Sequence, residues 1–265
     1  MPTPIEILLD PISLGVLALY GALMLWEAIT PGRKLAKVKG WIPRALGSFA
    51  IYFYLSSYLP LIWDGYLAEF QLFDLSGIGT LAGAAIGVFV YEGLVYAWHR
   101  ALHQSDFLFR SFHQMHHSAE RMDTYGAFYF SPLDMAGFTL LGSLSLSLIV
   151  GLSAQAVTLF LFATMFLGIF QHTNIKTPQW LGYFVQRPES HTIHHGKGLH
   201  KYNYSDLPVF DIIFGTFRNP KGYEMDTGFY DGASARIIDM LLCRDVSKEK
   251  QAPSEPAPAS NVAQA

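Results

Sequence analysis

Long apolar runs separated by short polar segments make up most of the first 171 residues of the chain. A transmembrane helix needs about 20 consecutive, mainly apolar residues, and five runs approach that length. The expected membrane-spanning helices cover about 11–29, 46–64, 77–98, 134–152 and 154–171. The first two runs give the weakest signal. The pattern therefore predicts an all-α integral membrane protein with four to five transmembrane helices.

Basic residues are concentrated between the first two runs, whereas the connection at 65–76 contains no Lys or Arg. Because cytoplasmic loops carry an excess of basic residues, we expect 31–45 to face the cytoplasm. Counting the spans onward places 99–133 and 172–265 on the same side. The topology thus predicts that all ten histidines share the cytoplasmic face.

Composition supports the membrane assignment and excludes other classes. Hydrophobic residues make up 51% of the chain and charged residues only 15%, which is too apolar for a soluble domain of this size. The net charge of -3 provides no basic surface for nucleic acid. Cys243 is the only cysteine, so no intramolecular disulfide and no cysteine-based zinc or iron–sulfur site can form. Any metal must be bound by histidine or oxygen.

Three histidine clusters follow the predicted spans. On a helix, residues three and four apart lie on one face, so each cluster can direct its imidazoles to one side. A ninth histidine, His172, follows the last span and lies near the clusters in the predicted topology. The clusters are His99 and His103, then His113, His116 and His117, then His191, His194 and His195.

These imidazoles outnumber the ligands of one metal ion. Imidazole suits zinc, copper, iron and nickel, whereas magnesium and calcium prefer oxygen ligands. A structural zinc needs four ligands, and nine histidines exceed that number. The residues therefore predict two metal ions, with copper, zinc and iron all open on chemistry alone.

The sequences HRALH, HQMHH and HTIHH, in this order after apolar runs, resemble the histidine boxes of the fatty acid hydroxylase (sterol desaturase) superfamily. The resemblance extends from about Glu92 to Phe217. It implies an integral-membrane oxygenase with two iron ions and O2 as co-substrate, in which zinc can take the place of iron in isolated protein. It also implies that the nine histidines named above are the metal ligands, carried on a cytoplasmic helical cap.

Two carboxylates match acidic positions of that family. Glu92 precedes the first box by seven residues, and Asp211 lies in a segment similar to the family's NYG…D…GT motif. A carboxylate within a span is costly unless it is paired, so we expect Glu92, and with it Asp211, to accept hydrogen bonds from ligand imidazoles. The chain departs from the family at Ser131-Pro132, where His-Pro is common, and in a longer segment that contains His200. We assign His200 no role.

The chain is expected to have three parts. The apolar runs predict transmembrane segments at 1–76, the resemblance implies a fatty acid hydroxylase-type catalytic domain at 77–246, and a composition rich in Pro, Ala and Ser predicts a disordered tail at 247–265. The first residues carry Glu6 and Asp10 instead of a basic segment. We therefore expect them to be retained and not cleaved as a signal peptide.

The predicted function is O2-dependent hydroxylation, or desaturation, of a lipid C–H bond in a sterol, fatty acyl chain or related lipid. No haem-binding, iron–sulfur or nucleotide-binding motif is visible, so a separate electron donor is expected, either cytochrome b5-like or a ferredoxin with its reductase. The alternative is a polytopic membrane metal transporter or metal-binding protein. The compact chain favours a bacterial inner membrane over the endoplasmic reticulum. The lipid, the position attacked and the oligomeric state do not follow from the sequence.

Overall fold

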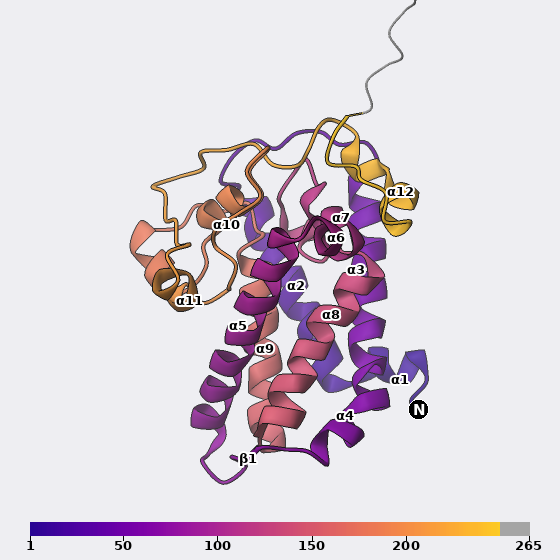
Figure 1. The fold of residues 1–265 in the computed structure, drawn as a ribbon, viewed down its shortest axis with the longest axis vertical. Coiled ribbons are helices and arrows are strands. Elements are labelled where there is room, and N and C mark those ends of the chain that lie inside the picture. Colours follow the sequence, from indigo (N-terminus) through magenta and orange to yellow (C-terminus); the bar gives the residue numbers. More distant parts are fainter. Residues whose placement is uncertain (250–265) are drawn as a thin grey trace, which may run out of the picture.

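The computed structural model describes residues 1–249 and forms an elongated helical bundle with short helices and loops gathered at one end (Figure 1). The expected disordered tail lies almost wholly outside the described residues. The long helices are α2 (Pro11–Ile29), α3 (Trp41–Tyr58), α5 (Thr80–Gln104), α8 (Pro132–Ser143) and α9 (Ala154–Phe170). The shorter helices are α1 (Pro4–Leu9), α4 (Pro60–Ala68), α6 (Asp106–Leu108), α7 (Gln114–His117), α10 (Pro188–His194), α11 (Val209–Ile213) and α12 (Ile237–Leu241).

Four helical stretches in the described part of the chain are long and apolar enough to cross a membrane: Pro11–Ile29, Trp41–Ala68, Thr80–Gln104 and Pro132–Ile149. Only 17–33% of their apolar windows is buried inside the protein, so most apolar side chains face outward, as a lipid environment requires. The fifth expected span is helix α9, which is shorter. The all-α membrane fold predicted from the sequence is confirmed.

The helix boundaries have local causes. Asp10 caps α2 by accepting from the Ile12 amide at 2.9 Å, with Pro11 in the first helical position. Pro60 separates α3 from α4 because it has no amide hydrogen to continue the helix. The predicted span at 46–64 is therefore a broken helix that starts earlier and ends later.

At the lower end in Figure 1, two short strands connect the loop after α4 to the loop before α9. Strands β1 (Phe73–Asp74) and β2 (Val150–Gly151) pair in parallel, with Phe73 opposite Val150. A π-helical segment, Leu144–Ile149, leads from α8 into β2. The connection between the last two spans is therefore tight, as the sequence predicts.

The opposite end joins segments far apart in the sequence. Asn174 donates to the Arg33 carbonyl at 2.7 Å, and Pro31 pairs with Ile175. Glu27 accepts from the Thr124 amide at 2.7 Å and from the Asn174 amide at 3.0 Å. The loops after the first, third and fifth expected spans therefore lie at one end, as the span count predicts; that this end faces the cytoplasm stays a prediction.

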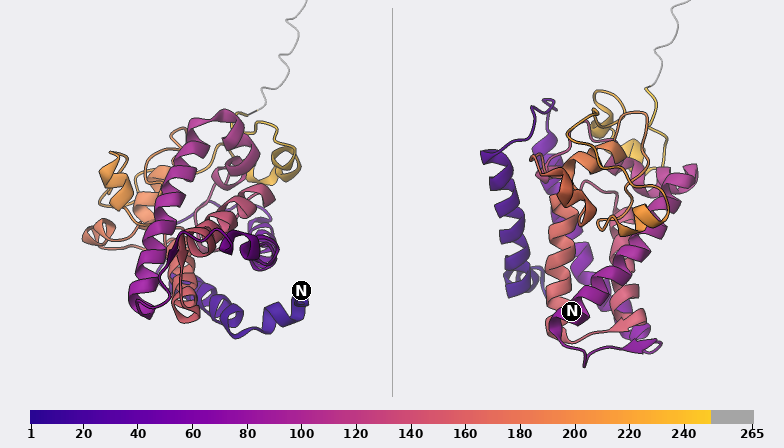
Figure 2. Two further views of the ribbon diagram at one scale, coloured as in Figure 1. Left: turned by 60° about the horizontal axis from the view of Figure 1, so that its bottom comes forward. Right: turned by 90° about the vertical axis from the view of Figure 1, so that its left-hand side faces the viewer.

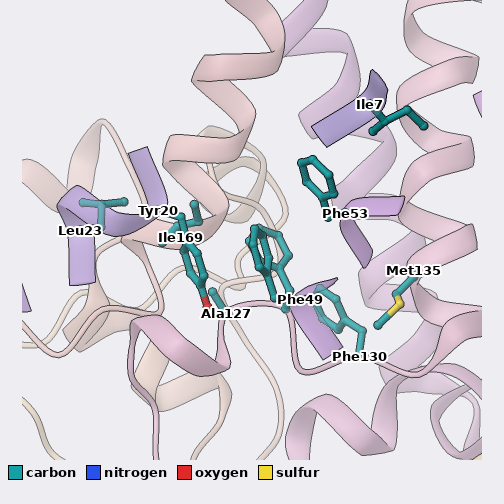
Figure 3. Close-up of a cluster of buried hydrophobic side chains, with 10 residues drawn as sticks. Ile7, Tyr20, Leu23, Phe49, Phe53, Ala127, Phe130, Met135 and Ile169 are labelled. Carbon is teal, nitrogen blue, oxygen red and sulfur yellow. The ribbon is translucent and has the colours of Figure 1, made fainter. Parts of the chain in front are cut away.

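Aromatic side chains fill the interior near that end. Figure 3 shows Tyr20, Phe49 and Phe130 converging from α2, α3 and the loop before α8. Helix α2 stands at the edge of the bundle (Figure 2) and is connected through this cluster and the Glu27 hydrogen bonds. The N-terminal helices are therefore integrated with the histidine-bearing part.

Glycines allow α5 to approach α9 closely. A Cβ atom on Gly87 would lie 2.9 Å from Leu152 Cδ1 and 3.3 Å from Phe160 Cδ2. We expect Gly87→Val to overpack this contact at a cost of about 1–3 kcal/mol in the free energy of unfolding. The melting temperature of detergent-solubilised protein should fall by roughly 2–10 °C.

Gly21→Val is the matched control, because nothing lies within 4 Å of the Cβ position of Gly21 in α2. Equal melting temperatures for the two variants would contradict the predicted close packing of α5 on α9.

Candidate metal centre

The structure brings the nine sequence-predicted histidines together in two adjacent groups, in which the candidate ligand atoms of each group lie within 4.8 Å of one another. The first group has five members: His99, His103, His113, His117 and His194. The second group has four: His116, His172, His191 and His195. All but His103 are buried.

The two groups do not correspond to the three sequence boxes, because the second and third boxes contribute histidines to both groups. Both histidines of the first box, one turn apart on α5, belong to the first group. The second box divides, since His113 and His117, four residues apart, belong to the first group and His116 belongs to the second. His194 likewise points to the first group while His191 joins the second. We expected each cluster to present one face, and this was wrong for the second and third boxes.

In the second group the Nε2 atoms form a chain of short contacts. The distances are 3.1 Å between His116 and His172, 3.1 Å between His172 and His191, and 3.2 Å between His191 and His195. A neutral imidazole has one N–H, so His172 Nε2 cannot satisfy both neighbours and also donate through Nδ1. Metal–nitrogen bonds of about 2.0–2.1 Å place neighbouring ligand nitrogens roughly 3 Å apart. The residues therefore fit a metal ion.

In the first group, His99 Nε2 and His113 Nε2 lie 2.9 Å apart. Three further ring nitrogens are buried without a hydrogen-bond partner among the described residues: the Nε2 atoms of His103, His117 and His194. Each buried, unsatisfied polar atom costs about 1–3 kcal/mol, so such a set is stable only with a shared ligand. A cation accounts for all of these nitrogens at once.

Hydrogen bonds on the far side of the rings fix their tautomers. His99 Nδ1 donates to the Tyr204 carbonyl at 2.7 Å, and His172 Nδ1 donates to the Gly168 carbonyl at 2.6 Å. His194 Nδ1 donates to the Tyr202 carbonyl at 2.7 Å. Since Nδ1 carries the hydrogen in each case, the Nε2 lone pair points into the cluster, ready to bind a metal.

Burial lowers the pKa of five imidazoles outside the membrane spans, and neighbouring imidazoles lower it further; these are His116, His117, His191, His194 and His195. Burial likewise lowers the pKa of His172 to about 4. These rings are therefore neutral at pH 7, and protons compete little for the lone pairs.

Glu92 and Asp211 do not contact an imidazole, which corrects our expectation. Glu92 Oε2 accepts from Ser205 Oγ and from the Asp206 amide, both at 2.8 Å. Asp211 accepts from the Tyr204 and Ser205 amides at 2.9 and 3.0 Å. Both carboxylates thus hold the loop whose Tyr204 carbonyl orients His99. They support the site through this loop and not by a direct hydrogen bond to an imidazole.

Asp134 is the carboxylate that does contact an imidazole, and the sequence analysis missed it. Its Oδ2 lies 2.6 Å from His113 Nδ1, and both side chains are buried. Ser131 positions it, because the Ser131 hydroxyl caps α8 and donates to the Phe112 carbonyl next to His113. The sequence feature that could have indicated this contact is an acidic residue in the first turn of a predicted span.

His200, to which no role was assigned, also reaches the site. Its Nδ1 lies 3.0 Å from Nδ1 of His117. The segment bearing it is strained, since His200, Tyr202 and Asn203 all have positive φ values of 43°, 70° and 50°. His200 therefore gives His117 the outer hydrogen bond that backbone carbonyls give to His99 and His194.

A buried ion pair fixes the start of α10. Arg187 Nη2 lies 3.1 Å from Glu189 Oε2, and Arg187 Nη1 donates to Asn219 Oδ1 at 2.6 Å. Glu189 also accepts from the Thr177 amide at 2.8 Å. Because each charge is paired and hydrogen-bonded, this end of the helix that carries the third box is rigidly placed.

Two neighbouring cavities lie within the bundle. The larger part of this space, about 350 Å³, lies between α2, α3, α5, α8 and α9, and the smaller part, about 80 Å³, is lined by His99, His113 and His116. Phe49 lines the larger part and Phe130 the smaller (Figure 3). The two parts share five lining residues: Tyr52, Tyr91, Phe138, Thr164 and Met165. Of the aromatic run 125–130, Phe128 and Phe130 line the smaller part.

Fold and site define a helical membrane protein whose two histidine groups could hold metal ions at one end of an apolar cavity. Residues 84–216, half of the chain, match the family model described as fatty acid hydroxylase. The chain belongs to the fatty acid hydroxylase family, which confirms the resemblance seen in the boxes.

Three relatives illustrate the range of this family. The chain is 32% identical over 127 residues to sphinganine C4-monooxygenase 1 of Arabidopsis thaliana, covering 46% of this chain and 48% of that protein. It is 30% identical over 142 residues to an ornithine lipid hydroxylase of Rhizobium tropici, covering 51% and 41%. It is 27% identical over 139 residues to a very-long-chain aldehyde decarbonylase of Oryza sativa subsp. indica, covering 49% and 52%. The chain thus spans about half the length of the curated relatives it matches, and no solved structure matches it significantly.

We expect Asp134→Asn to weaken metal binding by the first group about 10- to 100-fold, because the amide cannot replace the charged acceptor of His113 Nδ1. Elemental analysis of the purified variant, dialysed against a graded chelator series, measures this loss. Asp74→Asn, an exposed carboxylate at the other end of the bundle, is the matched control. Equal metal retention by both variants would contradict a role for Asp134 in orienting His113.

Proposed function

We propose that this protein is an integral-membrane, O2-dependent lipid hydroxylase with two iron ions held by the nine histidines. The observation that carries the proposal is the pair of neighbouring cavities, of which the larger lies between the spans and the smaller is lined by imidazoles of both groups. Family membership supports the reaction class, and two of the three relatives are a sphinganine C4-monooxygenase and an ornithine lipid hydroxylase. These names favour hydroxylation over desaturation.

The proposed ligands are those of the two groups, five for one ion and four for the other. When bound, the iron ions supply the redox chemistry that activates O2 toward a C–H bond. A separate one-electron carrier, cytochrome b5-like or a ferredoxin with its reductase, supplies the electrons from the cytoplasmic side. Residues 77–246 form the catalytic part, and 1–76 complete the wall of the cavity.

The chain's own residues position the substrate and exclude water. Phe130 lies against His116 with ring centroids 4.3 Å apart, and Phe138 lies 6.1 Å from His113. A methylene chain in the cavity would rest on these rings, with one carbon held at the nitrogen cluster. Because the larger cavity is lined by Ile12, Ser13 and Val16 of the edge helix α2, the lipid enters sideways from the bilayer.

The metal-transporter alternative receives less support. A transported ion needs a polar path to both faces, with ligands near the membrane midplane. In this protein the histidines gather at one end, and the cavity that continues below them is mainly aromatic and aliphatic. A lipid tail suits this lining, whereas a hydrated cation does not.

Purified protein from iron-replete cells should contain two metal ions per chain, and cells that express it should contain a hydroxylated lipid that control cells lack. His116→Ala should lower the metal content to about one ion and the product by at least about 100-fold, because it breaks the four-histidine group. Elemental analysis, Mössbauer spectroscopy and lipidomics measure these effects.

Phe107→Ala is the control, since it removes an exposed aromatic ring at the same end of the bundle. One metal ion or fewer in the wild-type protein, or full product from His116→Ala, would overturn the two-ion proposal.

Gly142→Phe tests the cavity separately from the metals. Nothing lies within 4 Å of the Cβ position of Gly142, which lines the larger cavity far from the histidines. A phenyl ring should therefore fill space needed by the lipid and lower kcat/KM about 10-fold or more, with both metal ions retained. Gly47→Phe, on an exposed position of α3 with nothing within 4 Å, is the control. Unchanged kcat/KM in Gly142→Phe would exclude this cavity as the substrate site.

A further inference from the structure

Asp206 contributes the only carboxylate to the lining of the smaller cavity within the described residues. The same lining includes histidines of both groups: His99, His113, His116, His172 and His191. Asp206 lies in the loop after the third box and outside every histidine spacing, so the sequence analysis did not single it out.

Three contacts hold Asp206 in place. Gln171, which lines the same cavity and precedes His172, donates from Nε2 to Asp206 Oδ1 at 2.6 Å. The Asp206 amide donates to Glu92 at 2.8 Å, and its carbonyl accepts from the Gln186 amide at 2.8 Å. The two backbone contacts do not depend on the side chain, so a substitution at 206 leaves the loop anchored.

The surroundings of this carboxyl favour its protonated form. No Lys or Arg is among the described residues that line the cavity, and burial raises the pKa of Asp206 to about 7. The ionisable groups that act on it are the Glu92 carboxyl and the phenols of Tyr52 and Tyr91, and histidines of both groups line the same cavity. A neutral carboxylic acid therefore stands at the wall of the cavity that these histidines line, near neutral pH.

We propose that Asp206 is the acid that protonates oxygen during lipid hydroxylation, an inference that rests on the proposed function. Insertion of one oxygen atom into a C–H bond consumes O2, two electrons from the one-electron carrier and two protons, and releases one water. Asp206 is the carboxyl that lines this cavity within the described residues, and it can supply these protons. The Asp206 carboxyl gives both protons, one after the other, to the oxygen atom that leaves as water, and solvent reprotonates the carboxylate after each transfer.

Asp206→Asn is the first test variant, because it keeps the size of the side chain and removes the proton. We expect kcat to fall about 100-fold, with KM within about twofold of wild type and two metal ions retained. Less product should form per O2 consumed. Asp206→Glu, which restores a carboxyl, should recover part of kcat, and Glu69→Gln, an exposed carboxylate at the far end, should match wild type.

The pH profile gives a second readout. Because the acid works when protonated, wild-type kcat should be highest below about pH 7 and fall as the pH rises through that value. Asp206→Asn should lose this limb. A retained limb would overturn the proposal.

The other outcomes separate the explanations. A raised KM at unchanged kcat would overturn the acid role and assign Asp206 to lipid binding. Metal loss in both the Asn and the Glu variant would make Asp206 structural and overturn the proposal. Unchanged kcat in Asp206→Asn, with an active wild type, would refute this inference alone, whereas a wild type that forms no hydroxylated lipid would refute the proposed function itself.

Discussion

The structure of the histidine-bearing end depends on one constraint: nine imidazoles lie close together in the protein interior. In the second group the Nε2 atoms face one another at about 3 Å. Without a shared cation, several buried nitrogens would lose their hydrogen bonds with water and gain nothing in return. On the proposed function, metal binding and folding of this end are therefore thermodynamically coupled, because bound ions offset the cost of assembling the cluster.

Carboxylates hold the cluster in shape mainly through the backbone. Glu27 joins the end of α2 to Thr124 and Asn174, and Glu92 joins α5 to the loop at 205–207. Among the carboxylates of residues 1–249, only Asp134 has a hydrogen bond to a ligand ring. A buried carboxylate that accepts hydrogen bonds from several backbone amides restricts the loop to few conformations. The carbonyl groups of that loop then orient the imidazoles. Irregular chain between spans thereby gains the rigidity that a metal site requires.

Much of the fold and the choice of histidines could be predicted from the sequence, because both depend on local periodicity. Apolar run length determines where spans form, and spacings of three and four residues bring imidazoles together. The division of the second and third boxes between the two groups could not be predicted, since it depends on which rings of the other boxes each imidazole meets in the folded protein. The partners of Glu92 and Asp134 were hidden for another reason: they lie far away in sequence, and single-sequence reasoning does not resolve tertiary contacts.

The position of the site at one end of the bundle follows from the two environments that it must serve. On the proposed function, the lipid stays in the hydrocarbon layer, while electrons and protons arrive from water. Asp134 and Ser143 both lie on helix α8. The rise of about 1.5 Å per residue puts roughly 14 Å between them along the helix axis, which is about half the thickness of a 30 Å hydrocarbon core. Ser143 lines the deep cavity, and Asp134 holds His113 at the top. Helix α8 therefore connects the larger cavity within the bundle to the polar end that carries the histidines. On the proposed function, a carbon within the lipid tail can reach the metal site while the rest of the lipid remains in the membrane.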